Sequence, residues 1–253
     1  MNDMNAIPPQ IPPQIPPSYG PAIRPPGENP EERVPIPNFL AAIEALLRQP
    51  RRVMFQLRQP GSGRLIAAML FVSIVCSLIY GLVVGSFSGG AQWWAAPVKV
   101  SAGLLISALI CVPSLYIFTC LSGSQARLVE IFGLLAGLLM LMTILLIGFA
   151  PVAWLFSQST QSITWMGALH LLFWFISTCF GVRFLQAGFS HSNARSNGGL
   201  HVWVVIFMLV AIQMTTALRP ILGTSDTFLP TEKQFFLTHW SDCLKPAGTT
   251  TRD

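Results

Sequence analysis

Five long runs of apolar residues fill the middle of the chain, and short polar segments separate them. They cover residues 65–87, 98–121, 128–156, 163–187 and 200–222. A helix needs about 20 mainly apolar residues to cross the hydrocarbon core of a membrane, and each run is long enough. The runs are apolar on every side, whereas the strands of a membrane barrel alternate polar and apolar positions. The pattern therefore predicts five transmembrane helices.

Two shorter stretches before the first run are amphipathic. The first follows Asn38, a residue type that caps helices, and ends before Pro50. Its apolar stripe consists of Phe39, Leu40, Ile43, Leu46 and Leu47. The second covers residues 51–58 and sets Val53, Met54, Phe55 and Leu57 among arginines. Both are expected to lie on the cytoplasmic leaflet as interfacial helices.

The two ends of the chain have a different composition. Residues 1–38 are rich in proline, and the repeat IPPQIPPQIPPS favours an extended polyproline II conformation. Such a segment serves as a spacer or docks in an aromatic groove of a partner, and both interpretations stay open. In the C-terminal tail, Thr231 and Gln234 resemble a capping box before a short amphipathic helix.

These patterns predict an all-α polytopic membrane protein with four parts. Residues 1–38 form a Pro-rich extended segment, and residues 39–63 form the basic interfacial helices. Residues 64–222 form the five-helix transmembrane domain, and residues 223–253 form the tail. The N-terminus has no apolar signal region, so the first span is expected to act as an uncleaved anchor.

Composition supports lipid as the solvent of the middle of the chain. Of all residues, 52% are hydrophobic and 10% are charged, whereas a soluble domain has about 25% charged residues. The charged residues between positions 65 and 222 are Lys99, Arg127, Glu130, Arg183, Arg195 and Arg219. A soluble globule cannot cover its surface with so few charges.

The charges also predict an orientation. Five arginines lie within residues 46–64, directly before the first span, namely Arg48, Arg51, Arg52, Arg58 and Arg64. Short cytoplasmic loops carry excess Lys and Arg, while the loops 88–97 and 157–162 have no charge. The N-terminus is therefore expected in the cytoplasm and the C-terminus outside. The arginines are expected to attract anionic headgroups at about 1 kcal/mol each; binding to nucleic acid is the weaker interpretation.

Tryptophan placement agrees with this orientation, because indole prefers the headgroup level. Four tryptophans fall near predicted outer ends, and Trp203 falls near an inner end. The four are Trp93, Trp94, Trp154 and Trp165.

Polar residues within the spans are few, and each has a structural interpretation. Arg127 and Glu130 lie three residues apart and are expected to form a local ion pair rather than a proton relay. Arg183 is expected to reach the inner headgroups, and Arg219 to cap outer loops or hold a headgroup. His170 and Gln213 are expected to form interhelical hydrogen bonds.

Glycine and proline predict how the spans pack. The words GLVVG (Gly81, Gly85) and GLLAG (Gly133, Gly137) have the spacing that lets helix backbones approach closely. Pro113 and Pro151 lie within spans, where a kink is expected.

Signals for metal or catalytic sites are absent from the sequence. Its four histidines (170, 191, 201 and 239) lack metal-ligand spacing, and its five cysteines (76, 111, 120, 179 and 243) form no CxxC. No phosphate-binding loop, nucleophile elbow or zinc-protease motif occurs. Neither a cofactor nor an enzymatic activity is expected.

Over about residues 45–222 the chain resembles the Yip family of five-span membrane proteins. The resemblance rests on PRRVMFQL before the first span, LSGSQARLVEIFGLLAG and FAPVAWLF around the third, and FGVRFLQAGFS at the end of the fourth. PSYGP at 17–21 keeps Tyr19, Gly20 and Pro21 of a signature of eukaryotic members but lacks its acid and its leucine, which leaves Rab binding open. The resemblance implies a non-enzymatic organiser of membranes or membrane complexes.

The expected function is therefore that of an integral membrane scaffold or accessory subunit. Its expected partners are anionic lipids, other membrane subunits or a second copy, and a protein with an aromatic groove for the Pro-rich segment. A bacterial cytoplasmic membrane is the expected location, with a Golgi or ER membrane as the alternative. The alternative function, a small-molecule or ion transporter or channel subunit, would need a polar track; the candidates are Ser107, Thr119, His170, Gln213 and the kinks at Pro113 and Pro151.

Overall fold

The computed structural model describes residues 27–88, 90, 92–124, 126–160, 162–190 and 198–217. Within these ranges the regular secondary structure is entirely helical, with one short 3-10 helix, η1 (Pro30–Arg33), and seven α-helices. Two are short, α1 (Phe39–Arg48) and α2 (Pro50–Leu57). The expected C-terminal helix, Arg219 and most of the Pro-rich segment lie outside the described residues.

The remaining five helices are long and apolar enough to cross a membrane, which confirms the predicted class. They are α3 (Gly63–Ser88), α4 (Gln92–Leu121), α5 (Leu128–Ser159), α6 (Ile163–Ser190) and α7 (Gly198–Ala217). The 26 residues of α3 give a length of about 39 Å at 1.5 Å per residue. That exceeds the hydrocarbon thickness of about 30 Å.

One predicted boundary is wrong. Residues 92–97 belong to α4 and not to the predicted loop 88–97, so Trp93 and Trp94 lie in the first turn of this helix. Pro97 lies inside α4 although proline has no N–H for the helix ladder. Its fixed φ still suits a helix, and membrane helices tolerate such a proline where neighbouring groups compensate.

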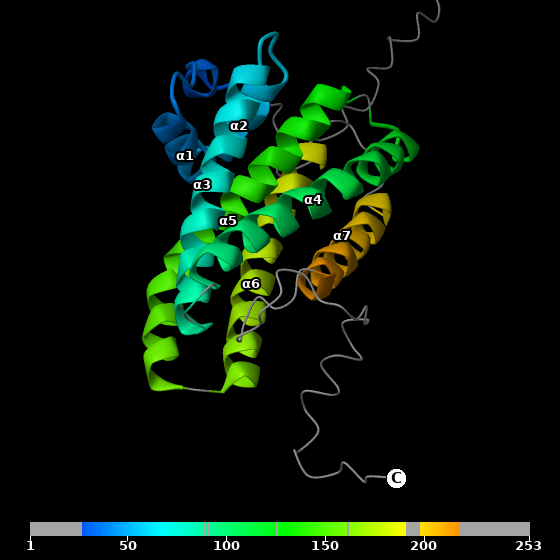
Figure 1. Cartoon of the computed structure of the whole chain (residues 1–253). Coiled ribbons are helices and arrows are strands. Elements are labelled where there is room, and N and C mark those ends of the chain that lie inside the picture. The colour runs from blue at the N-terminus through cyan, green and yellow to red at the C-terminus, as the bar shows by residue number, and fades with distance from the viewer. Residues whose placement is uncertain are drawn as a thin grey trace, which may run out of the picture.

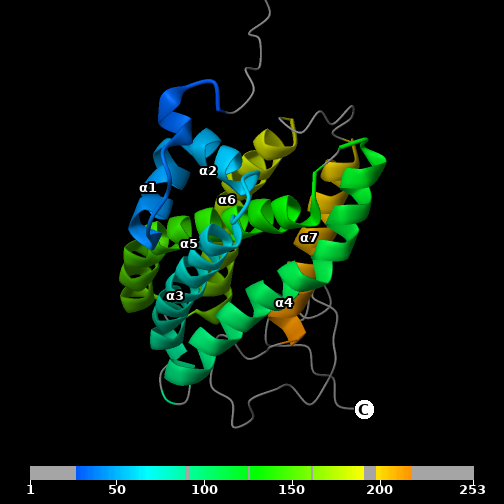
Figure 2. The same ribbon diagram turned by 90° about the horizontal axis from the view of Figure 1, so that it is seen from above.

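Helix α5 lies at the centre of the bundle. Of its most apolar 18-residue stretch, 67% is buried against other parts of the protein, whereas the corresponding share is 22–39% in the other four spans. It packs between α3 and α6, while α4 packs on the other side of α3 and α7 packs on α4 (Figures 1 and 2). The order across the bundle is therefore α6, α5, α3, α4 and α7.

The buried residues form two clusters, one toward each end of the bundle. The larger lies at the end where α1 and α2 cover the bundle, here named the shelf end (Figure 1). The smaller lies at the opposite end, where α3, α5 and α6 meet around Tyr80, Met142, Met166 and Phe173. The two short helices thus belong to the main core.

The two predicted glycine motifs are used differently. A Cβ atom at Gly81 would overlap the Cα atom of Pro97, so the backbones of α3 and α4 approach closely there, as predicted. Gly133 instead receives the side chain of Leu57 from α2, and Gly137 receives that of Phe184 from α6. In α5 the missing side chains therefore make space for neighbouring side chains rather than for a neighbouring backbone.

Candidate functional site

Among the described residues, the densest group of polar contacts lies at the shelf end, where residues 27–37, here named the strap, fold against α2. Glu32 of η1 is buried and forms an ion pair with Arg51, with 3.0 Å between Arg51 Nε and Glu32 Oε1. Its other carboxylate oxygen accepts the backbone N–H of Gly27. Gly27 has φ +99°, a region that favours glycine, and the ring of Phe55 fills the space where a side chain would stand.

Arg52 and Gln56 bind the extended part of the strap. The Arg52 guanidinium donates to two successive carbonyls, through Nε to Val34 O and through Nη2 to Pro35 O, both at 2.9 Å. The Gln56 amide donates to Val34 O at 2.6 Å and accepts the N–H of Ile36 at 3.4 Å. Because prolines 35 and 37 lack N–H groups, this segment relies on side chains of α2 for its hydrogen bonds.

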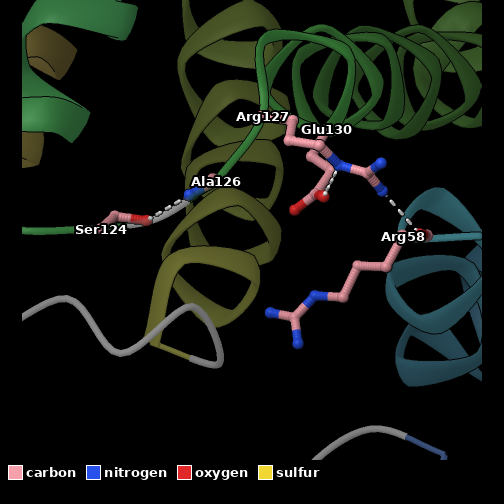
Figure 3. Close-up of polar contacts among 5 residues, drawn as sticks. All are labelled: Arg58, Ser124, Ala126, Arg127 and Glu130. Carbon is pink, nitrogen blue, oxygen red and sulfur yellow. Dashed lines mark hydrogen bonds and ion pairs between the residues drawn. The ribbon is translucent and has the colours of Figure 1, made fainter.

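A second set of contacts fixes α2 to the central helix. Leu57 fills the space at Gly133 of α5. Arg127 donates through Nη2 to Arg58 O at 2.8 Å, and its Nε lies 2.9 Å from Glu130 Oε1, so the expected ion pair is present (Figure 3). The Glu130 carboxylate in the first turn of α5 also suits the positive end of the helix dipole.

The structure places the five arginines before the first span in different roles. Arg51 and Arg52 bind the strap, and the backbone carbonyl of Arg58 accepts a hydrogen bond from Arg127. Arg48 pairs with Glu44 at 3.1 Å on the exposed side of α1. Arg64 is exposed at the start of α3. The sequence suggested that all five meet lipid headgroups, whereas protein groups engage Arg51 and Arg52.

Helix α2 also departs from the expectation of an interfacial helix. Val53, Met54 and Leu57 are at most 3% exposed and belong to the main core, to which α1, α5 and α6 also contribute. The apolar face of α2 is thus turned toward protein. Helix α1 buries Ala42, Ala45 and Leu46 in the same core but keeps other apolar side chains exposed.

Inside the bundle, Tyr80 of α3 and His170 of α6 form an interhelical hydrogen bond, as expected for His170. The Tyr80 hydroxyl and His170 Nδ1 are 2.7 Å apart, and the two rings meet edge to face. Nε2 of His170 is buried and has no hydrogen-bond partner among the described residues. Sequence reasoning missed Tyr80, because a tyrosine in an apolar run reads as one more aromatic residue.

Most hydroxyl groups in the spans bond to their own helix. Ser107 donates to Gly103 O at 2.6 Å and Thr119 to Leu115 O at 2.7 Å, each one turn earlier in α4. The same contact is made by Ser73, Thr143 and Thr178. The two hydroxyls proposed for a polar track therefore bond within α4.

The polar end of one tryptophan joins α7 to α4. Trp203 is fully buried among protein side chains, and its indole N–H donates to Cys111 O at 2.9 Å. Its ring stacks on Phe207. This contact fixes the peripheral helix α7 at the shelf end.

The other singled-out residues lie apart from one another. Arg183 is exposed on α6, with its guanidinium 6.0 Å from the ring centre of Phe180. Gln213 is half-buried near the end of α7, and Gly85 is buried in α3. Lys99, which the sequence presented only as a charge near the outer end, is 1% exposed in α4.

Three comparisons with known proteins found no relative of this chain. No family model matches the chain, and neither the curated proteins nor the solved structures contain a significant match.

Proposed function

We propose that this chain is a non-enzymatic integral membrane scaffold or accessory subunit that organises a membrane or a membrane protein complex. The observation that carries the proposal is the shelf, defined as the strap, α1 and α2. The ion pair of the buried Glu32 with Arg51, and the two hydrogen bonds from Arg52 to carbonyls of the strap, hold the strap on α2 and give this end of the bundle a fixed shape.

The contacts within the spans support the same conclusion. A transporter needs polar groups directed toward a substrate path, and Ser107 and Thr119 instead donate to carbonyls of their own helix. The hydrogen bond between Tyr80 and His170, 2.7 Å long, joins α3 to α6, and such a bond stabilises the packing of the two helices. A subunit whose role is to hold neighbours needs a stable bundle and a shaped surface rather than a polar path.

The proposed setting follows the charge pattern and the resemblance to the Yip family. The shelf faces the cytoplasm, and the membrane is the bacterial cytoplasmic membrane. The proposed partners are membrane subunits or a second copy at the shelf, and a protein with an aromatic groove for the Pro-rich segment before residue 27.

The test is purification of the full chain from its native membrane in a mild detergent, followed by native mass spectrometry. The proposal predicts a complex of fixed composition that Arg52→Ala, which loosens the strap, largely dissociates. Arg48→Ala is the matched control, since it removes a neighbouring exposed arginine of α1 and should leave the complex intact. Recovery of the chain alone, with solute flux in liposomes that contain only this chain, would support the transporter alternative instead.

A further inference from the structure

Helix α1 has two apolar faces. One face carries Ala42, Ala45 and Leu46, which are at most 2% exposed and pack in the main core. The opposite side carries Leu40, which is 63% exposed, and Leu47, which is 49% exposed. Single exposed apolar residues are ordinary on a protein surface. Two exposed leucines two turns apart on one helix, with the half-buried Ile43 between them, form a stripe instead.

This stripe continues a lipid-facing surface of the bundle. At the start of α1, the ring of Phe39 meets the ring of Phe71 of α3 edge to face, with 6.4 Å between their centres. Phe71 is exposed and begins a row of exposed apolar residues along one side of α3. The row continues with Val75, Ile79 and Leu82. Because α3 spans the membrane, this row faces acyl chains. The exposed apolar side of α1 adjoins the row at Phe71 and continues the same apolar surface at the shelf end.

We propose that the outer face of α1, formed by Phe39, Leu40, Ile43 and Leu47, is a docking surface for membrane phospholipid. It inserts into the leaflet at the shelf end, so that α1 lies in the interface with protein on one side and lipid on the other. Glu44 and Arg48 form an exposed ion pair beside the leucines, at the level where headgroups and water meet.

Helix α2 does not share this role. Its residues Val53, Met54 and Leu57 are buried in the main core, and its arginines Arg51 and Arg52 bind the strap. The lipid contact of the shelf is thus assigned to one helix. The inference needs only the transmembrane architecture and goes beyond the scaffold function, so its failure would leave the complex described above untouched.

The first test uses nitroxide labels on the full chain in nanodiscs of phosphatidylethanolamine and phosphatidylglycerol. A cysteine-free background receives Leu47→Cys or, as the matched control one residue later, Arg48→Cys. The label at 47 should collide with oxygen more than with a water-soluble nickel complex, and the label at 48 should show the reverse. A nickel-accessible label at 47 would overturn the proposal, as would one shielded from both reagents, because a protein partner would then cover the face.

A second test avoids labels and the loss of native cysteines. In nanodiscs, Leu40→Ser together with Leu47→Ser should raise hydrogen exchange of the α1 amides by about tenfold or more, because lipid no longer holds the outer face. Glu44→Ser, at an exposed polar position of the same helix, should leave exchange close to that of the native chain. Unchanged exchange in the double variant would contradict lipid docking.

Discussion

Replacing Gly81 by alanine tests the closest approach between two spans. An added Cβ atom would lie 3.0 Å from Pro97 N and 3.3 Å from Ala96 O, and would overlap the Cα atom of Pro97. All three atoms are backbone of α4, so no side chain can rotate away. Helices α3 and α4 must therefore separate at their crossing.

The cost follows from the size of that separation. Ordinary van der Waals contact begins near 3.4 Å, and the overlap with the Cα atom of Pro97 is the largest shortfall, so the helices must move apart by roughly 1 Å there. Gaps of about 0.5–1 Å already forfeit a quarter to a half of the dispersion energy of the contacts involved. Overpacking a core typically costs about 1–3 kcal/mol, while alanine regains up to about 1 kcal/mol of helix preference over glycine.

Gly148→Ala separates these two effects. Gly148 also lies within a spanning helix, α5, but a Cβ atom there meets nothing within 4 Å. This control should keep the gain in helix preference without the clash. Gly81→Ala is therefore expected to be about 1–3 kcal/mol less stable than Gly148→Ala.

The assay is equilibrium unfolding of the full chain in mixed micelles of mild detergent and dodecyl sulfate, followed by circular dichroism. Equal unfolding midpoints for Gly81→Ala and Gly148→Ala would refute the close crossing of α3 and α4, because the clash is the difference expected between them.

Three further changes probe other contacts. Glu32→Gln removes the buried partner of Arg51, so the strap should become susceptible to limited proteolysis while unfolding of the bundle changes little. Tyr80→Phe removes the hydrogen bond to His170 and should destabilise the bundle by about 0.5–2 kcal/mol in the same micelle assay. Trp203→Phe keeps an aromatic ring but loses the indole donor to α4, so hydrogen exchange in α7 should rise while that in α5 stays unchanged.

Each of these has an outcome that contradicts it. Glu31→Gln changes the exposed acid next to Glu32 and should leave proteolysis of the strap as in the native chain; equal cleavage of both variants would remove the role of the buried pair. Tyr80→Phe in a His170→Phe background should cost nothing further, and an undiminished cost would place the effect elsewhere. Faster exchange throughout the bundle of Trp203→Phe would mean that α7 is not held locally.

The five spans were predictable because crossing a membrane requires local properties. Length and apolar composition are visible in any window of the sequence, and α5 begins at the predicted Leu128. The tryptophans show where this local argument holds and where it stops. Trp94 is 82% exposed and Trp165 is 70% exposed, whereas Trp203 is fully buried. An indole near the end of a span suits a headgroup or a buried carbonyl acceptor, and only the neighbouring helix decides.

The shelf was harder to predict because its contacts join residues far apart in the sequence. Arg127 and Glu130 are three positions apart, so helical spacing predicted their pair. Arg51 meets Glu32 only because the strap folds back on α2. A basic residue before a span looks the same in sequence whether its partner is a lipid phosphate or a carboxylate of its own chain.

The glycine spacing likewise predicted close packing but did not predict which neighbouring group fills the space. At Gly81 the neighbour is a helix backbone, while at Gly133 the neighbour is the side chain of Leu57. A small residue creates space in both cases. What fills that space depends on which helix lies opposite, and a sequence motif does not contain that choice.

Five helices are proposed to cross lipid with the shelf in the cytoplasm, and site-directed labelling in cells tests this arrangement most directly. Single cysteines replace Arg64 at the shelf end and Trp94 in the first turn of α4, both of which are exposed. A membrane-impermeant maleimide should label the Trp94 position in intact cells, and the Arg64 position only after the membrane is opened. Labelling of both positions from the same side would contradict the account.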